Sequence, residues 1–234
     1  MIGIIGAMDV EIDELKKRIV LPVKTKIAGI DFVCGEIENV TVCAARCNPG
    51  KVNAALCAQI MIDRFSVESI INIGVGCSLS PSVAIKNVVI ATEVCQYDID
   101  TTGCGDPAGF ISGMGVINIE TDKELSDGLA LAAIRSGEKI HRGKVATGDY
   151  FIASNEIKEK IAERFGAICG EMEGGAIGQV CYANSVPFAV LRSISDGGNE
   201  ASAIDYPTFK SIAAKISTAT VTDYLKTQKT QLEI

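Results

Sequence analysis

Histidine is almost absent from this chain of 234 residues, because His141 is the only one. A histidine-based catalytic triad or a multi-histidine metal site is therefore close to excluded. The nine cysteines show no Cys-x-x-Cys pair and no zinc-like spacing. An odd number of unpatterned cysteines is typical of a reducing compartment, where free cysteine behaves as a small apolar residue. We expect a cytoplasmic protein without a metal site.

A surplus of basic residues is also lacking. The net charge is −7, which argues against a nucleic-acid partner, since nonspecific binding to nucleic acid draws on lysine and arginine surfaces. The apolar opening, residues 1–8, is too short to span a membrane and is followed by acidic residues. Without a basic leader it does not match a signal peptide, and it predicts a first buried strand.

Short runs rich in Val and Ile alternate with longer helix-like segments, which is the pattern of an α/β fold. The runs predict strands at Ile2–Ala7, Ile30–Glu38, Val40–Arg46, Ser69–Val75, Asn87–Cys95, Lys144–Ala146 and Phe188–Ile194. The other segments predict helices at Glu11–Ile19, Lys51–Arg64, Lys123–Ser136, Glu156–Arg164, Gly175–Ala183 and Tyr206–Lys226, with Asp9 as the N-cap of the first. Two successive strands at residues 30–46 favour a hairpin, so we expect a mixed sheet in one domain over residues 1–234.

Small residues mark the ends of two predicted strands. Glu11 follows the opening GIIGAMDVE, where it is most simply a first-turn residue favoured by the helix dipole. Val75 and Gly76 belong to a second glycine-rich strand end, GVGCSL. Such an end allows a ligand to approach the backbone of an α/β sheet, but it is equally consistent with an ordinary tight turn.

Aromatic and charged residues stand out further along the chain. Phe151 follows a strand-end turn and is suited either to stacking on a purine or to packing in the core. Glu171 and Glu173 lie among small and apolar residues, and Asp196 ends a buried strand that also carries Arg192. A structural ion pair accounts for one carboxylate only, and the surplus of buried charge favours a functional site.

Taken together, these segments resemble the 5′-methylthioadenosine/S-adenosylhomocysteine nucleosidase family of the purine nucleoside phosphorylase-like superfamily. The resemblance is carried, in order along the chain, by GIIGAMDVE, GKVNAA, the glycine-rich strand end, GDYFI, EMEGGAI and VPFAVLRSISD. It implies a single three-layer domain with a mixed, twisted central sheet flanked by helices. It also implies a homodimer that needs no cofactor and takes a small-molecule nucleoside as its substrate.

The resemblance also assigns roles to residues. Asp196 matches the acid that protonates N7 of the leaving adenine, Glu11 matches the carboxylate that activates water, and Arg192 lies where the family helps to hold that water. Glu173 matches the acceptor for the ribose hydroxyls. The remaining substrate-binding positions are Met8, Val75, Gly76, Phe151, Ile152, Glu171, Met172 and Ser195, with Met172 packing on the sugar, Phe151 stacking on adenine and the backbone of Ile152 reading the base edge.

The sequence favours hydrolysis of an N-glycosidic bond over phosphorolysis. Related phosphorylases carry an arginine two residues before the strand-end glycine, at the position of Asn72 here, and a PGDPxR opening that this chain lacks. The substrate expected is 5′-methylthioadenosine, S-adenosylhomocysteine or a related 5′-substituted adenosine. A purine nucleoside phosphorylase and a noncatalytic nucleoside-binding protein of the same fold are the alternatives. Cys77 and Ser78 replace glycines that are usual in the family.

Overall fold

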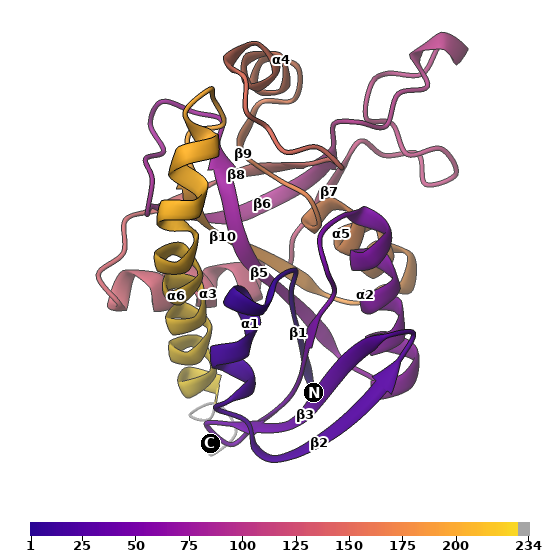
Figure 1. Cartoon of the computed structure of the whole chain (residues 1–234). Helices are drawn as coiled ribbons and strands as arrows, with labels where there is room; N and C mark the ends of the chain where they lie inside the picture. The colour runs from indigo at the N-terminus through magenta and orange to yellow at the C-terminus, as the bar shows by residue number, and fades with distance from the viewer. Residues whose placement is uncertain (229–234) are drawn as a thin grey trace.

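The computed structural model describes residues 1–228, which form one ten-stranded sheet and six α-helices (Figure 1). The strands are β1 (Ile2–Gly6), β2 (Val20–Ile27), β3 (Ile30–Ile37), β4 (Val40–Arg46), β5 (Ser69–Ser78), β6 (Val88–Gln96), β7 (Asn118–Glu120), β8 (Ile140–Thr147), β9 (Ala167–Glu171) and β10 (Phe188–Asp196). The helices are α1 (Asp9–Lys16), α2 (Lys51–Phe65), α3 (Lys123–Arg135), α4 (Asn155–Phe165), α5 (Gly174–Asn184) and α6 (Ser202–Gln228).

The sheet is mixed, as predicted. Strand β1 lies between β4 and β5 and runs parallel to both, while β2, β3 and β4 form an antiparallel meander at one side. On the other side, β5 pairs with both β10 and β9. Strand β10 also pairs with β6, β6 with β8, and β8 with β9, so these five strands form a closed ring. The closure brings the carboxyl ends of β1, β5, β8, β9 and β10 toward one region of the molecule.

Helices cover both faces of the sheet, which confirms the three-layer α/β fold. Helices α1, α3 and α6 lie together on one face and α2 and α5 on the other (Figure 1). The first layer packs through Ile12, Leu129 and Val221 onto sheet residues such as Ile71, all of them buried. Burying such aliphatic side chains stabilises the fold by roughly 1.5–3 kcal/mol each.

Three strands were absent from the sequence prediction. Strand β2 is exposed along almost its whole length, so it lacks the alternation of apolar and polar residues that identifies a half-buried strand. Strands β7 and β9 are three and five residues long, which is too short for a periodic pattern.

The N-cap of helix α1 lies one residue earlier than predicted. Met8 is the N-cap and Asp9 is the first helical residue, so the prediction that Asp9 caps α1 is wrong. The physical reason is that the Glu11 side chain accepts the Met8 N–H, which is the bond by which a glutamate at the third helical position fixes the N-cap three residues before it. The carboxylate of Asp9 instead pairs with Arg46 at 2.6 Å.

Over residues 1–228, none of the helices has the length and apolar character needed to cross a membrane.

Candidate active site

A cavity with an empty volume of about 560 Å³ lies where these strands end. It is lined by Ala7, Met8, Glu11, Pro49, Val75, Gly76, Cys77, Tyr150, Phe151, Ile152, Gly170, Glu171, Met172, Glu173, Ser195, Asp196 and Tyr206. The lining therefore includes every site residue predicted from the sequence except Arg192.

The Glu11 carboxylate is buried and faces back toward the sheet. Its Oε2 accepts hydrogen bonds from the backbone N–H groups of Ala7 at 2.8 Å and Met8 at 2.9 Å, and its Oε1 accepts one from Val75 at 2.9 Å. Burial raises the pKa of Glu11, while the Val75 hydrogen bond and the charge of Arg192 oppose that shift. A Cβ at Gly74 would lie 2.8 Å from Glu11 Oε1, so the strand-end glycine provides the space for this carboxylate.

Asp196 ends β10 and is fixed by three donors. Its Oδ1 accepts hydrogen bonds from the Gly198 N–H at 3.0 Å and from Ser202 Oγ at 2.7 Å, and its Oδ2 accepts one from Ser195 Oγ at 2.9 Å. Ser195 was predicted from the sequence, whereas Ser202 was not. Ser202 is the first residue of α6 and fully buried, and a single serine before a helix gives no sequence signal for such a role.

Arg192 lies behind the cavity wall with its side chain only 1% exposed. It donates hydrogen bonds to Glu171 and to the side-chain oxygen of Asn72, and its Nη2 lies 3.8 Å from Glu173 Oε2. Leaving a buried guanidinium unpaired would be costly, so these acceptors are required for it to stay in the interior. The geometry makes Arg192 the shared counter-ion of a carboxylate cluster.

Glu171 lies in the cavity wall, and its oxygens are engaged by the protein. Oε2 accepts hydrogen bonds from the backbone N–H groups of Glu173 at 2.9 Å and Gly174 at 2.7 Å, in addition to the bond from Arg192. Oε1 accepts one from the hydroxyl of Thr147. Glu171 thus joins the ends of β8, β9 and β10 through one side chain.

Glu173, which precedes α5, is bound less tightly. Its Oε1 accepts a hydrogen bond from the Gly50 N–H at 2.9 Å, and burial together with the negative charge of Glu171 raises its pKa to about 8. A carboxyl group with such a pKa is protonated in part at neutral pH, so it can both donate and accept hydrogen bonds toward the cavity.

Two aromatic side chains of the cavity lining contact each other. The ring of Phe151 meets that of Tyr206 edge-on, with ring centroids 5.4 Å apart and planes at 75°. The Tyr206 hydroxyl lies 3.0 Å from the sulfur of Met8. Phe151 is 42% exposed, so its ring is available to a ligand rather than packed in the core. The sequence prediction did not include Tyr206 as a site residue, because it only marked the expected start of the last helix.

Among residues 1–228, no group of three or more His, Cys, Asp or Glu side chains is placed to hold a metal ion.

Comparison with known proteins decides the family. The model of the phosphorylase superfamily matches residues 1–226. A 5′-methylthioadenosine/S-adenosylhomocysteine nucleosidase of Shewanella frigidimarina is 37% identical over 210 residues, which cover 89% of this chain and 91% of that protein. The chain belongs to the 5′-methylthioadenosine/S-adenosylhomocysteine nucleosidase family of the phosphorylase superfamily. Its assignment from sequence motifs is confirmed.

Other members of this family widen the range of activities. An aminodeoxyfutalosine nucleosidase of Campylobacter jejuni is 35% identical over 216 residues, which cover 92% of this chain and 94% of that protein. The nucleosidase of Neisseria meningitidis in complex with methylthio-immucillin-A has a TM-score of 0.93 at 28% identity, covering 97% of this chain and 98% of that one. The futalosine hydrolase of Helicobacter pylori has a TM-score of 0.92 at 32% identity, covering 97% of each chain. The nucleosidase fold therefore extends over nearly the whole chain.

Proposed function

We propose that this chain hydrolyses the N-glycosidic bond of a 5′-substituted adenosine and releases adenine. The observation that carries the proposal is the pair Glu11 and Asp196, two buried carboxylates that line one cavity from two different strand ends. Breaking such a bond passes through an oxocarbenium-like sugar, which is helped by an acid at the leaving base and a base that activates water. A cavity with one carboxylate for each role suits this chemistry.

Asp196 is the general acid. As the bond between C1′ and N9 breaks, its electron pair moves into the purine, and a proton from Asp196 neutralises N7. The three hydrogen bonds from Gly198, Ser202 and Ser195 fix the carboxyl group in the cavity wall, so its orientation does not have to be found during the reaction. Adenine then leaves as a neutral molecule.

Glu11 activates the water. Water adds its oxygen to C1′ and gives a proton to the Glu11 carboxylate. Burial makes this carboxylate more basic than one in solvent, while the N–H groups of Ala7, Met8 and Val75 hold it in place. Arg192 supports the same region from behind the cavity wall by balancing the charge of the carboxylates there.

The other lining residues recognise the nucleoside. Glu173 binds the ribose hydroxyls, Met172 packs on the sugar, and Phe151 stacks on adenine while the backbone of Ile152 reads the base edge. Glu171 contributes by holding Arg192 and the backbone of Glu173. Met8, Val75, Gly76 and Ser195 complete the wall.

Hydrolysis is favoured over phosphorolysis by Asn72. Its side chain donates a hydrogen bond to the Ile5 carbonyl at 3.0 Å and accepts one from Arg192, so the position that carries a phosphate-binding arginine in related phosphorylases is neutral here. The substrates we propose are 5′-methylthioadenosine, S-adenosylhomocysteine and aminodeoxyfutalosine-type nucleosides, since family members act on these.

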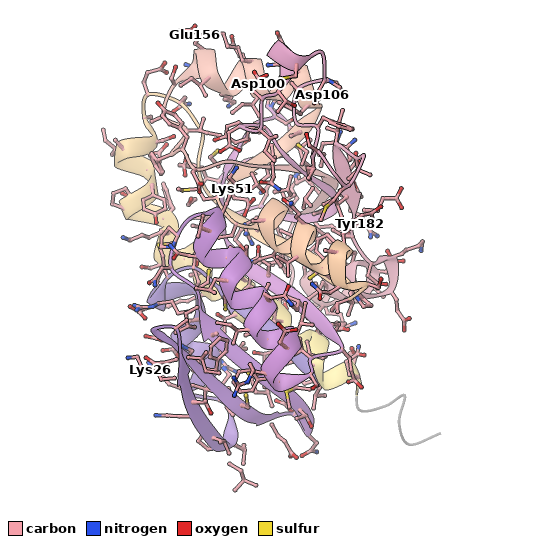
Figure 2. All side chains as sticks on the ribbon, turned by 90° about the vertical axis from the view of Figure 1, so that its right-hand side faces the viewer. Lys26, Lys51, Asp100, Asp106, Glu156 and Tyr182 are labelled. Atoms are coloured by element: carbon pink, nitrogen blue, oxygen red, sulfur yellow. The ribbon has the colours of Figure 1, made fainter. Side chains whose placement is uncertain are left out.

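We also propose a homodimer in the cytoplasm. Helices α2 and α5 expose Val52 (78%), Leu56 (42%) and Tyr182 (50%), and apolar side chains of this size favour a covered interface. Figure 2 shows Tyr182 on this side of the molecule. The nine cysteines, an odd number without Cys-x-x-Cys pairs, support a reducing compartment. Light scattering that gives the mass of a single chain would contradict the dimer.

The activity is tested by incubating the purified protein separately with 5′-methylthioadenosine, S-adenosylhomocysteine and aminodeoxyfutalosine. The proposal predicts free adenine from at least one of them, and kcat/KM then ranks the 5′ groups. Tight binding of all three without adenine release would favour a noncatalytic binding protein instead.

A further inference from the structure

The helix that follows Gly50 has an unusual start. Helix α2 has no acidic residue in its first turn and no capping hydrogen bond from its own N-cap side chain, since that N-cap is Gly50. The carboxylate of Asp149 takes this place from a loop 98 positions away, because its Oδ1 accepts the hydrogen bond of the Lys51 N–H at 2.8 Å. A carboxylate is stabilising at a helix N-terminus, where free N–H groups and the helix dipole favour negative charge.

A second carboxylate holds the first. Asp98, in the loop after β6, accepts a hydrogen bond from the Asp149 N–H at 2.9 Å through Oδ2 and pairs with Lys51 Nζ at 2.6 Å through Oδ1. Lys51 therefore contacts both aspartates, one through its backbone and one through its ammonium group. Figure 2 shows Lys51 at the start of α2. The ammonium group balances part of the negative charge that gathers there.

The same helix start reaches the cavity through Gly50. Its N–H donates to Glu173 Oε1 at 2.9 Å, and within residues 1–228 this is the only hydrogen bond that the Glu173 carboxyl group accepts. Gly50 has φ of +100°, a conformation that other residues rarely adopt, and a Cβ there would lie 3.1 Å from Asp149 Oδ1. The direction of the Gly50 N–H thus depends on a turn that only glycine adopts readily and that lies beside the Asp149 carboxylate.

We infer that Asp149 is a positioning residue for ribose recognition, which acts by fixing Gly50 so that its N–H orients the Glu173 carboxyl group, and that Asp98 holds Asp149 in place. This inference deepens the proposed function and rests on it, because Glu173 is there the acceptor for the ribose hydroxyls. Neither aspartate lines the cavity, and the path that we infer from them to the substrate runs through the helix start.

The test compares a substrate that carries the ribose hydroxyls with an analogue that lacks them, so it separates recognition of these hydroxyls from binding of the rest of the nucleoside. For Asp149→Ala, we expect KM for 5′-methylthioadenosine to rise by about 3- to 30-fold, the range that loss of one well-oriented hydrogen bond to the substrate covers. The inhibition constant of the 2′,3′-dideoxy analogue should stay within about twofold, because that analogue has no hydroxyl for Glu173 to bind. Asp149→Asn retains an oxygen that can accept the Lys51 N–H, so it should restore most of the affinity. Asp98→Ala should show the same pattern with a smaller change in KM.

A matched control is available on another helix. Asp122 is the N-cap residue of α3, and its carboxylate accepts the Leu125 N–H at 2.8 Å as that of Asp149 accepts the Lys51 N–H. Asp122 lies outside the cavity lining. Asp122→Ala should lower the melting temperature as Asp149→Ala does but leave KM unchanged. Equal changes for the substrate and the dideoxy analogue in Asp149→Ala, or no change in either, would overturn the inference. Absence of adenine release by the wild-type protein would instead count against the proposed function.

Discussion

The carboxylate of Glu11 accepts a hydrogen bond from the backbone N–H of Val75 at 2.9 Å, which ties the first turn of α1 to the end of β5. The bond joins two segments 64 residues apart at the floor of the cavity. It also explains why the second glycine-rich strand end matters, because Gly74 leaves room for the carboxylate beside it.

Replacing Glu11 by Gln tests its role as the base. The amide cannot take a proton from water, so we expect kcat to fall by about 100-fold or more, while KM changes little. Steady-state kinetics with 5′-methylthioadenosine measures both. Glu14→Gln is the matched control on the same helix, since Glu14 is exposed and pairs only with Lys17 among the described residues. A Glu11→Gln enzyme with near-normal kcat would remove Glu11 from the mechanism.

Replacing Asp196 by Asn removes the proposed acid but keeps its shape. We expect kcat to fall by about 100- to 10,000-fold, because adenine is a poor leaving group without a proton on N7. Nucleoside binding should persist, since an amide oxygen can still accept the hydrogen bonds of Gly198 and Ser202. Calorimetry for binding and a single-turnover assay for cleavage separate the two effects. Turnover close to that of the wild type would show that another group protonates the base.

The raised pKa of Glu173 predicts how stability changes with pH. Its pKa is about 8 in the folded state and 4.5 as the ordinary value, so the folded protein retains a proton that the unfolded chain has lost between these values. This contribution to stability is complete below pH 4.5 and is lost as pH rises through 8. The wild type should therefore lose stability over this range while Glu173→Gln does not. The melting temperature of Glu173→Gln minus that of the wild type should increase by a few degrees as pH rises from 5 to 9. Thermal unfolding of the ligand-free proteins across that range measures the difference, and a constant difference would contradict it.

Arg192 should be more important for stability than any single carboxylate near it. Arg192→Leu leaves Glu171 and Glu173 buried without their counter-ion, which typically costs about 3–5 kcal/mol. Urea unfolding measures the loss. Arg192→Lys keeps the charge but not the two-sided contact with Glu171 and Asn72, so it should lose less. If both variants unfolded at the same urea concentration as the wild type, the buried cluster would not depend on this cation.

Much of this arrangement could be predicted from the sequence. The buried strands β1 and β10 are largely apolar runs, and Glu11 and Asp196 lie at the ends of these runs, where ligands of α/β folds bind. Glu173 follows β9, which is too short to be recognised from its pattern. The partners that hold these groups could not be predicted. Thr147 meets Glu171 only because the ends of β8 and β9 converge, and Ser202 meets Asp196 only through the turn between β10 and α6. A single hydroxyl residue carries no local signal for either contact.

Helix α6 shows a second limit. The sequence predicts that it starts at Tyr206, but it starts at Ser202, and the large apolar Ile212 is 43% exposed whereas the small Ala213 is buried. The helix instead buries small and hydroxyl side chains, among them Ala214, Ser217, Thr218 and Val221. Close approach of a helix to the sheet requires small residues, so hydrophobicity alone does not identify most of the side chains that α6 buries.

The central claim is hydrolysis, and the nature of the sugar product tests it most directly. The purified protein is incubated with 5′-methylthioadenosine in phosphate-free buffer and again with added phosphate, and the sugar is identified by mass. The account predicts adenine and free methylthioribose in both buffers at the same rate. Adenine that forms only with phosphate, together with methylthioribose 1-phosphate, would contradict it and identify a phosphorylase.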